Sequence, residues 1–144
     1  MCEENTDSSK LLYYCGKLRE SIIKVKDKTI LFRDFPVGCC RDSAIILGDL
    51  LKNKGFSEIC YCRKPYDDFS KSHGWIEVGG YILDLTADQF GDGYPAITMI
   101  PKNSSLPIYR GKACSPCYIA IADFDAANLL HDYDLILETL FASI

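Results

Sequence analysis

Hydrophobic and polar positions recur along the chain with periods that predict helices at both ends and strands between them. Near the start, apolar residues follow a helical spacing, which predicts a helix over residues 8–25 whose buried face holds Leu11, Cys15, Leu18, Ile22 and Val25. At the end, a second such stripe predicts a helix that begins near Asp125 and buries Ala126, Leu130, Tyr133, Leu137, Phe141 and Ile144.

A further helix is predicted to begin at about Cys40. The short apolar segment 29–35 is β-prone and predicts a strand, which Pro36 ends. Asp42 then lies in the first turn of the predicted helix, an apolar run follows, and Gly55 comes just beyond its last lysines. These helix start and end signals place Cys40 at the beginning of the predicted helix.

The middle of the chain predicts a sheet. Strands are expected at residues 58–63, 74–78, 81–86, 95–100 and 117–124. Gly79-Gly80 separates two of these strands, and a two-residue glycine loop between β-prone runs is typical of a hairpin. The expectation is an α+β fold in a single domain, residues 1–144, with the Cys40 helix packed on a mostly antiparallel sheet.

Composition narrows the classes of function. The 144 residues are 48% hydrophobic and 25% charged, which is ordinary for a globular protein. A net charge of −4 gives no basic field for phosphate backbones, so no nucleic-acid partner is expected. Residues 1–10 lack the pattern of a secretory signal and no apolar run reaches the roughly 20 residues that span a bilayer, so we expect no membrane partner and a cytoplasmic location. Export as an effector by a non-classical route would leave no such signal.

The chain contains eight cysteines, and in a protein without a secretory signal the expected state is the free thiol. Cys60-x-Cys62 and Cys114-x-x-Cys117 together offer four thiolates, which zinc would accept. Cysteines two apart in a strand also point to one face, where they serve equally well as core residues, and a single Cys-x-x-Cys turn is more often only a turn. We therefore predict no metal and no cofactor.

Three residues fit the chemistry of a cysteine nucleophile. Cys40 at a helix start gains from the partial positive charge there, which favours a thiolate. If Gly79-Gly80 forms the hairpin turn, His73 and Asp84 become diagonal neighbours on one face of the sheet, about 7–8 Å apart between backbones. Asp84 would then orient His73 as the base. The same parity admits Asp88, although Asp84 lies inside a strand and Asp88 beyond it.

These motifs resemble those of a known superfamily. Gly38-Cys39-Cys40, residues 72–78 (SHGWIEV) and residues 83–90 (LDLTADQF) together resemble the transglutaminase-like, papain-fold Cys-His-Asp enzymes, most closely their small bacterial members. The resemblance implies a papain-like core with Cys40 as nucleophile, His73 as base and Asp84 as the orienting carboxylate. Cys39 remains an alternative nucleophile because the two cysteines are adjacent.

The resemblance implies attack of a thiol on a carboxamide or peptide bond of a protein or peptide substrate, through an acyl-enzyme. Water would then give protease or deamidase activity and an amine would give transglutamination, and we rank hydrolysis first. The papain pattern has a glutamine upstream of the nucleophile, whereas the only glutamine here is Gln89, so Gln89 or the Trp75 indole is a candidate oxyanion donor. The alternative function is a binding domain that kept the fold and lost turnover.

Overall fold

The computed structural model of the chain describes residues 8–64, 73–91, 93–104, 106–109, 113–114 and 127–142. Within these residues the α-helices are α1 (Ser8–Val25), α2 (Cys40–Asn53) and α3 (Ala127–Ala142). The strands are β1 (Cys60–Lys64), β2 (His73–Val78), β3 (Tyr81–Asp84), β4 (Thr98–Pro101) and β5 (Ala113–Cys114), and the 3₁₀ turns are η1 (Lys26–Lys28), η2 (Ala87–Phe90) and η3 (Pro107–Tyr109).

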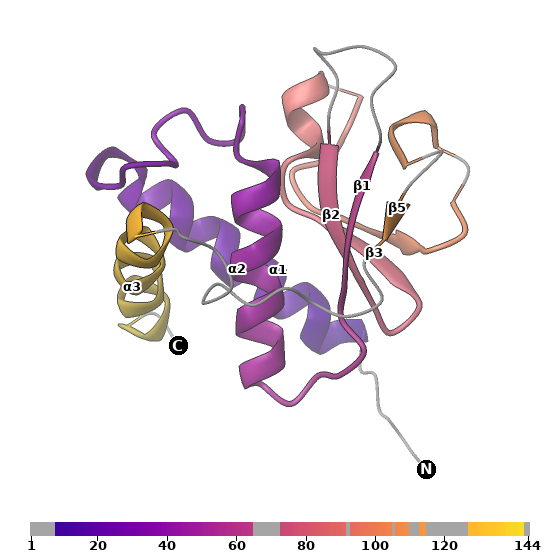
Figure 1. Ribbon diagram of the computed structural model, residues 1–144, viewed down its shortest axis with the longest axis horizontal. Helices are drawn as coiled ribbons and strands as arrows, with labels where there is room; N and C mark the ends of the chain where they lie inside the picture. Colours follow the sequence, from indigo (N-terminus) through magenta and orange to yellow (C-terminus); the bar gives the residue numbers. More distant parts are fainter. Residues whose placement is uncertain are drawn as a thin grey trace.

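The helices and the sheet form an α+β arrangement, as the sequence predicted. The strands run antiparallel in the order β4-β3-β2-β1-β5. Figure 1 shows α2 between the sheet and α3, with α1 crossing behind, and α2 packs directly on β2 while α1 packs on α3. The helix that begins at Cys40 is therefore central, because it contacts both the sheet and another helix.

The glycine pair forms the predicted hairpin turn. Val78 pairs with Tyr81 across it, so Gly79 and Gly80 are the two loop residues. Their φ angles are 62° and 84°, in the left-handed region that the type I′ turns of tight hairpins require and that glycine adopts without steric cost. This register places alternate residues of β2 on opposite faces of the sheet.

Each face of the sheet covers a separate apolar cluster. The large cluster lies on the helical side and contains Ile76 and Val78 of β2 together with the buried face of α1, which is the face that the sequence predicted. The small cluster lies on the other side and contains Cys62, Trp75, Ile82 and Tyr109. Trp75 therefore shares its face with His73, two residues earlier in the same strand.

The buried face of α3 differs from the predicted stripe. Leu129, Tyr133, Ile136 and Leu140 are buried, whereas Leu130 and Phe141 are each 50% exposed. The predicted stripe was correct for Tyr133 and in part for Leu137, which packs against the large cluster, and wrong for Leu130 and Phe141, while Ala126 and Ile144 lie outside the described residues. The reason is that Asp132, a polar residue, is fully buried on this helix and helps to set which side of α3 meets the rest of the molecule.

The predicted strand over residues 29–35 was wrong, because turns occupy this segment. Thr29 Oγ1 accepts a hydrogen bond from Phe32 N, and the Asp132 carboxylate accepts from Ile30 N at 2.8 Å and Leu31 N at 2.7 Å. These backbone donors are consequently satisfied without a partner strand. The strand predicted at 95–100 is shorter, since β4 begins at Thr98, and the one predicted at 117–124 lies outside the described residues.

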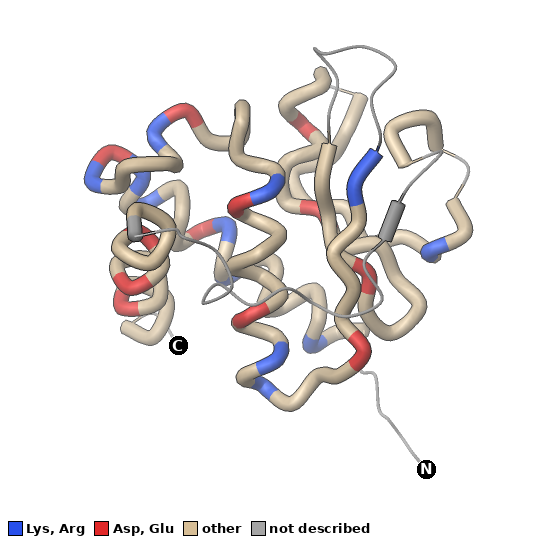
Figure 2. Tube along the Cα trace, in the orientation of Figure 1, with Lys and Arg blue, Asp and Glu red and all other residues tan. Residues whose placement is uncertain are grey.

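Three further observations concern cysteine pairing, helix length and charge among the described residues. Cys62 is disulfide-bonded, so the expectation of free thiols was wrong for this cysteine, while Cys15, Cys39, Cys40 and Cys60 are free. Among the described residues no helix is long and apolar enough to cross a membrane. Figure 2 shows Lys and Arg dispersed along the described trace and interspersed with Asp and Glu.

Candidate active site

The two adjacent cysteines lie in different environments. Cys39 immediately precedes α2, is 1% exposed, and its Sγ contacts the carbonyl oxygens of Leu31 and Val37 at 3.4 Å. Burial, and then the negative charges of its neighbours, raise the pKa of the Cys39 thiol to about 12. Cys40 is the first residue of α2 and is partly exposed. Of the two, only Cys40 combines accessibility with a position at the helix start.

His73 and Asp84 form a buried pair at the near ends of β2 and β3. His73 Nε2 lies 2.5 Å from Asp84 Oδ2, and both side chains are 1% exposed. Asp84 Oδ2 also accepts a hydrogen bond from the Tyr109 hydroxyl at 2.7 Å, and Oδ1 accepts from Thr86 N at 2.9 Å and Thr86 Oγ1 at 3.4 Å. The carboxylate thus has two donors on each oxygen, which explains how a charge can be buried there.

Cys40 also interacts with His73. Because Nε2 is engaged by Asp84, Nδ1 is the ring nitrogen that remains for the thiol. Nδ1 is buried and has no hydrogen-bond partner among the described residues. Burial lowers the pKa of His73. The hydrogen bonds and negative charges of Asp84 and Cys40 raise it by more, so the pKa rises from 6.5 to about 9. At neutral pH the ring is therefore an imidazolium.

Three aromatic side chains surround the His73 ring. The Phe90 ring meets it edge to face with centroids 4.9 Å apart, Trp75 lies at 5.5 Å and Tyr109 at 6.0 Å. Such walls exclude water and strengthen the interactions of His73 with its charged partners. Tyr109 was missed by sequence reasoning. It comes from η3 in an irregular stretch, where no periodicity or motif indicates that its hydroxyl reaches Asp84.

Asp88, the alternative orienting carboxylate, is engaged elsewhere. Arg19 of α1 binds it through both guanidinium nitrogens, at 3.1 Å and 2.7 Å, and the same guanidinium donates to the carbonyl oxygens of Leu85 and Ala96. This bidentate clamp holds the segment that contains η2 against α1. Asp88 therefore fixes the turn that carries Gln89 and Phe90, and Asp84 is the carboxylate that contacts His73.

The two candidate oxyanion donors, Trp75 and Gln89, differ in their hydrogen-bond partners. The Trp75 indole N–H points to Glu77 Oε2 at 3.4 Å, so it is directed along the strand. Gln89 accepts a hydrogen bond from Gly38 N at 3.3 Å through Oε1, which fixes its side chain against the loop that leads to Cys40. Its Nε2 is buried and has no hydrogen-bond partner among the described residues. Gln89 thus retains a donor that is free to bind an oxygen atom near the nucleophile.

The Tyr61 ring of β1 packs closely against the backbone of β2 on the face opposite His73. It covers Gly74, and a Cβ at Gly74 would lie only 2.6 Å from the Tyr61 hydroxyl. Burial and the negative charge of Cys40 raise the pKa of Tyr61 to about 12, so this hydroxyl keeps its proton. The glycine after His73 is required because it makes room for that ring.

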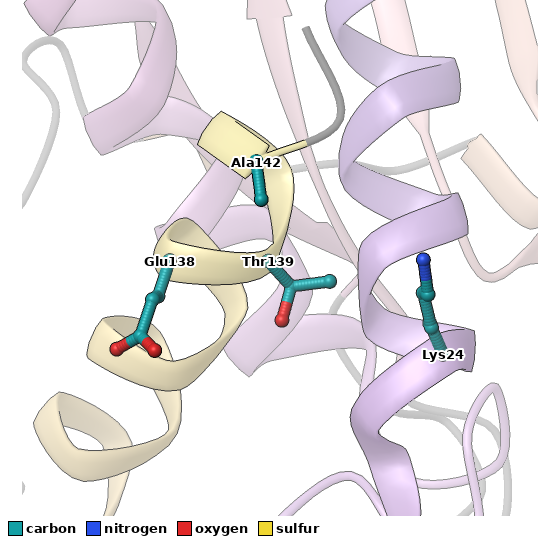
Figure 3. Close-up of a pocket in the computed structure, with 4 residues that line it drawn as sticks. All are labelled: Lys24, Glu138, Thr139 and Ala142. Atoms are coloured by element: carbon teal, nitrogen blue, oxygen red, sulfur yellow. The ribbon is translucent and has the colours of Figure 1, made fainter.

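One cavity, of about 330 Å³, borders His73 and also contacts Lys64, Phe90, Tyr94, Pro107 and Ile108. Another, of about 320 Å³, lies between α1 and α3; Figure 3 shows the residues that line it, Lys24 on α1 and Glu138, Thr139 and Ala142 on α3. The described residues that line this second cavity include no cysteine and no histidine. No cluster of metal-ligating side chains occurs among the described residues, and the disulfide at Cys62 removes one thiolate from the four considered for zinc.

A scan against protein-family models found no match, and searches of curated proteins and of solved structures found none either. The function must therefore be argued from the geometry of the site itself.

Proposed function

We propose that this chain is a papain-like, transglutaminase-related cysteine enzyme that transfers acyl groups from a carboxamide or peptide bond. The single observation that carries the proposal is that His73 interacts both with the partly exposed Cys40 and with the buried carboxylate of Asp84. A nucleophile, a proton carrier and an orienting group in this order are the parts that thiol acyl transfer needs.

In the acylation step, the Cys40 sulfur attacks the carbonyl carbon of the substrate and its electron pair forms the carbon–sulfur bond. The carbonyl π electrons move to the oxygen, which becomes an oxyanion. When this intermediate collapses, the bond to nitrogen breaks, and the His73 imidazolium gives its Nδ1 proton to the leaving amine. The products are a thioester on Cys40, a free amine and a neutral imidazole.

In the second step, His73 acts as a base. Nδ1 accepts a proton from water or from an acceptor amine as that molecule attacks the thioester carbonyl. Collapse expels the Cys40 thiolate and restores the imidazolium. Water gives a carboxylic acid, which is hydrolysis or deamidation, and an amine gives transamidation. Asp84 keeps Nδ1 directed toward the sulfur by holding Nε2 throughout.

The oxyanion has two sources of stabilisation near Cys40. The first N–H groups of an α-helix have no carbonyl partners within the helix, and α2 begins with the nucleophile itself. The unpartnered Nε2 of Gln89 supplies a side-chain donor on the loop side. Preorganised donors of this kind are worth about 10²–10³ in rate each.

The proposal is tested by the reaction of the purified protein with p-nitrophenyl acetate at neutral pH. We expect a burst of p-nitrophenolate equal to one per chain and an acetyl group on Cys40 in the intact-protein mass spectrum. The burst should disappear in Cys40→Ser and persist in Cys39→Ser, which is the matched control. With iodoacetamide, His73→Ala should lower the rate of Cys40 alkylation by roughly 10-fold or more, because only a few per cent of an ordinary thiol is ionised at pH 7.

A binding domain without turnover would behave differently. The accessible thiols would then be alkylated slowly and at similar rates, and His73→Ala would leave the rate at Cys40 unchanged. That result would contradict the enzyme proposal. An acetyl group on Cys39 in place of Cys40 would contradict the assignment of the nucleophile.

A further inference from the structure

The cavity beside His73 is a candidate recognition site for the substrate. Its walls come from the end of β1, the start of β2, η2, the following loop and η3, so segments that are far apart in the sequence enclose it. Its volume of about 330 Å³ is at the small end of the range of ligand pockets. It therefore suits one large side chain or a small acyl group and is too small for a folded segment.

The walls of this cavity are mostly apolar. Phe90 presents its ring beside His73, and Pro107 and Ile108 of η3 form another wall. Tyr94 adds a second aromatic ring that is partly buried. Apolar walls of this kind favour a ligand with an aromatic ring or a branched or long aliphatic body, because removing apolar surface from water is favourable.

The cavity also contains one lysine. Lys64 Nζ donates to the carbonyl oxygen of Pro107 at 3.2 Å, which holds the ammonium group against the η3 wall. An ammonium group has three donors, so two remain for a ligand. Among the described residues, none of those that line the cavity is acidic, and no ion pair with Lys64 is formed. His73, the other cation, is already matched by Asp84.

We propose that this cavity binds the residue or acyl group next to the reacting carbonyl, and that it selects an apolar body that ends in a carboxylate. The inference rests on the proposed function, because it assigns a substrate to the Cys40 site. The carboxylate accepts hydrogen bonds from Lys64 while the apolar body packs against Phe90 and Ile108. Substrates with a cationic group at this position are disfavoured by like-charge repulsion.

The experiment uses three chloroacetanilides that differ only at the para position, which carries a carboxylate, a neutral carboxamide or a trimethylammonium group. In each, the Cys40 sulfur displaces chloride and forms a thioether, so the reaction is the same and only recognition differs. The rate of Cys40 alkylation is measured against reagent concentration by intact-protein mass spectrometry. We expect the carboxylate reagent to give half-maximal rate at a concentration about 10-fold lower than the carboxamide, with the trimethylammonium reagent slowest.

Variants separate the possible causes of such a preference. Lys64→Met should abolish the preference for the carboxylate, Lys64→Arg should keep most of it, and Lys102→Met should leave it unchanged because that lysine lies in an exposed turn after β4. In the unmodified protein, added salt should reduce the preference without changing the carboxamide rate.

Two outcomes overturn the inference while leaving the proposed function intact: equal rates for the three reagents, and a preference that survives in Lys64→Met or is insensitive to salt. In both cases alkylation of Cys40 would still depend on His73. Labelling that is independent of His73 contradicts the proposed function instead, so the two failures are distinguishable.

Discussion

Asp84 shows how a single buried carboxylate organises the candidate site. Its four hydrogen bonds come from the imidazole of His73, the hydroxyl of Tyr109, and the backbone and side chain of Thr86. Thr86 follows Asp84 by two residues, so its hydrogen bonds to the carboxylate are local and orient it. This gives the spacing of Asp84 and Thr86 a physical meaning. The bond from Tyr109 is long-range and depends on the complete fold.

The raised pKa of His73 predicts how stability depends on pH. The ordinary pKa of a histidine is 6.5, and in the folded protein this one is about 9, because Asp84 and Cys40 outweigh the effect of burial. The stabilisation is fully present below pH 6.5 and is lost as the pH rises toward 9. The free energy of unfolding, measured by urea denaturation, should therefore fall between these two pH values.

The matched control for this pH dependence is His73→Gln, which should be less stable at pH 6.5 and lose little further stability up to pH 9. The buried thiols Cys15 and Cys39 have pKa values raised from 9.0 to about 12, so their loss of stabilisation begins only above pH 9. A decline of equal size between pH 6.5 and 9 in His73→Gln would show that another group is responsible.

Gln89 offers a second test at the residue scale. If its free Nε2 binds the oxyanion, Gln89→Leu should slow acetylation of Cys40 by p-nitrophenyl acetate about 10²-fold or more. Alkylation by iodoacetamide is a displacement at a saturated carbon and develops no oxyanion, so its rate should stay within about 3-fold. Parallel loss of both rates would instead mean that Gln89 only supports the loop through Gly38.

At the scale of the elements, the close contact between β1 and β2 limits which residue can follow His73 in β2. A methyl group at Gly74 would lie 2.6 Å from the Tyr61 hydroxyl and 3.2 Å from the ring carbon beneath it. Gly74→Ala should therefore lower the free energy of unfolding by about 1–3 kcal/mol, and by less in a Tyr61→Phe background. Urea denaturation of the four proteins measures this coupling.

The control for the cost of Gly74→Ala is Gly93→Ala, in the loop before β4, because an added methyl group there meets no described atom within 4 Å. Its free energy of unfolding should change by less than about 0.5 kcal/mol. Equal costs for Gly74→Ala in the presence and absence of the Tyr61 hydroxyl would show that this hydroxyl is not what resists the substitution.

Helices and strands could be predicted from the sequence where the apolar periodicity agreed with the residues that end an element. α1 and α2 follow helical periods with clear ends, and Gly79-Gly80 fixes the hairpin register that brings His73 and Asp84 together. The segment 29–35 was predicted wrongly because its composition favours a strand, whereas its N–H groups are taken by Asp132, which lies about a hundred residues later. A partner so distant leaves no trace in a local pattern.

At the scale of the whole molecule, Asp132 joins the last described helix to the segment that leads to Cys40. Asp132→Ala would leave the partly buried N–H groups of Ile30 and Leu31 without their acceptor, so we expect the free energy of unfolding to fall by about 1–3 kcal/mol. Asp134→Ala, on the exposed side of the same helix, should change it by less than about 0.5 kcal/mol. Equal effects in urea denaturation would contradict this role.

The residues of the candidate site also divide into those that local sequence patterns predict and those that only the complete fold brings together. Cys40, His73 and Asp84 could be selected from the sequence because a helix start and a hairpin parity bring them close. Tyr109 and the cavity around Lys64 could not, because both depend on where η3 lies against the sheet. The pairing of Asp88 with Arg19 was likewise invisible, since it joins the first helix to a turn almost seventy residues away.

The contrast between Cys39 and Cys40 has a consequence for redox chemistry. Peroxide reacts with thiolates, so it should convert the accessible Cys40 to a sulfenic acid well before it touches the buried, protonated thiol beside it. That product lacks a nucleophilic sulfur, and a small thiol reductant can restore it. If Cys40 is the nucleophile of the proposed reaction, exposure to oxidants would therefore inactivate the site reversibly and leave the Cys39 thiol unmodified.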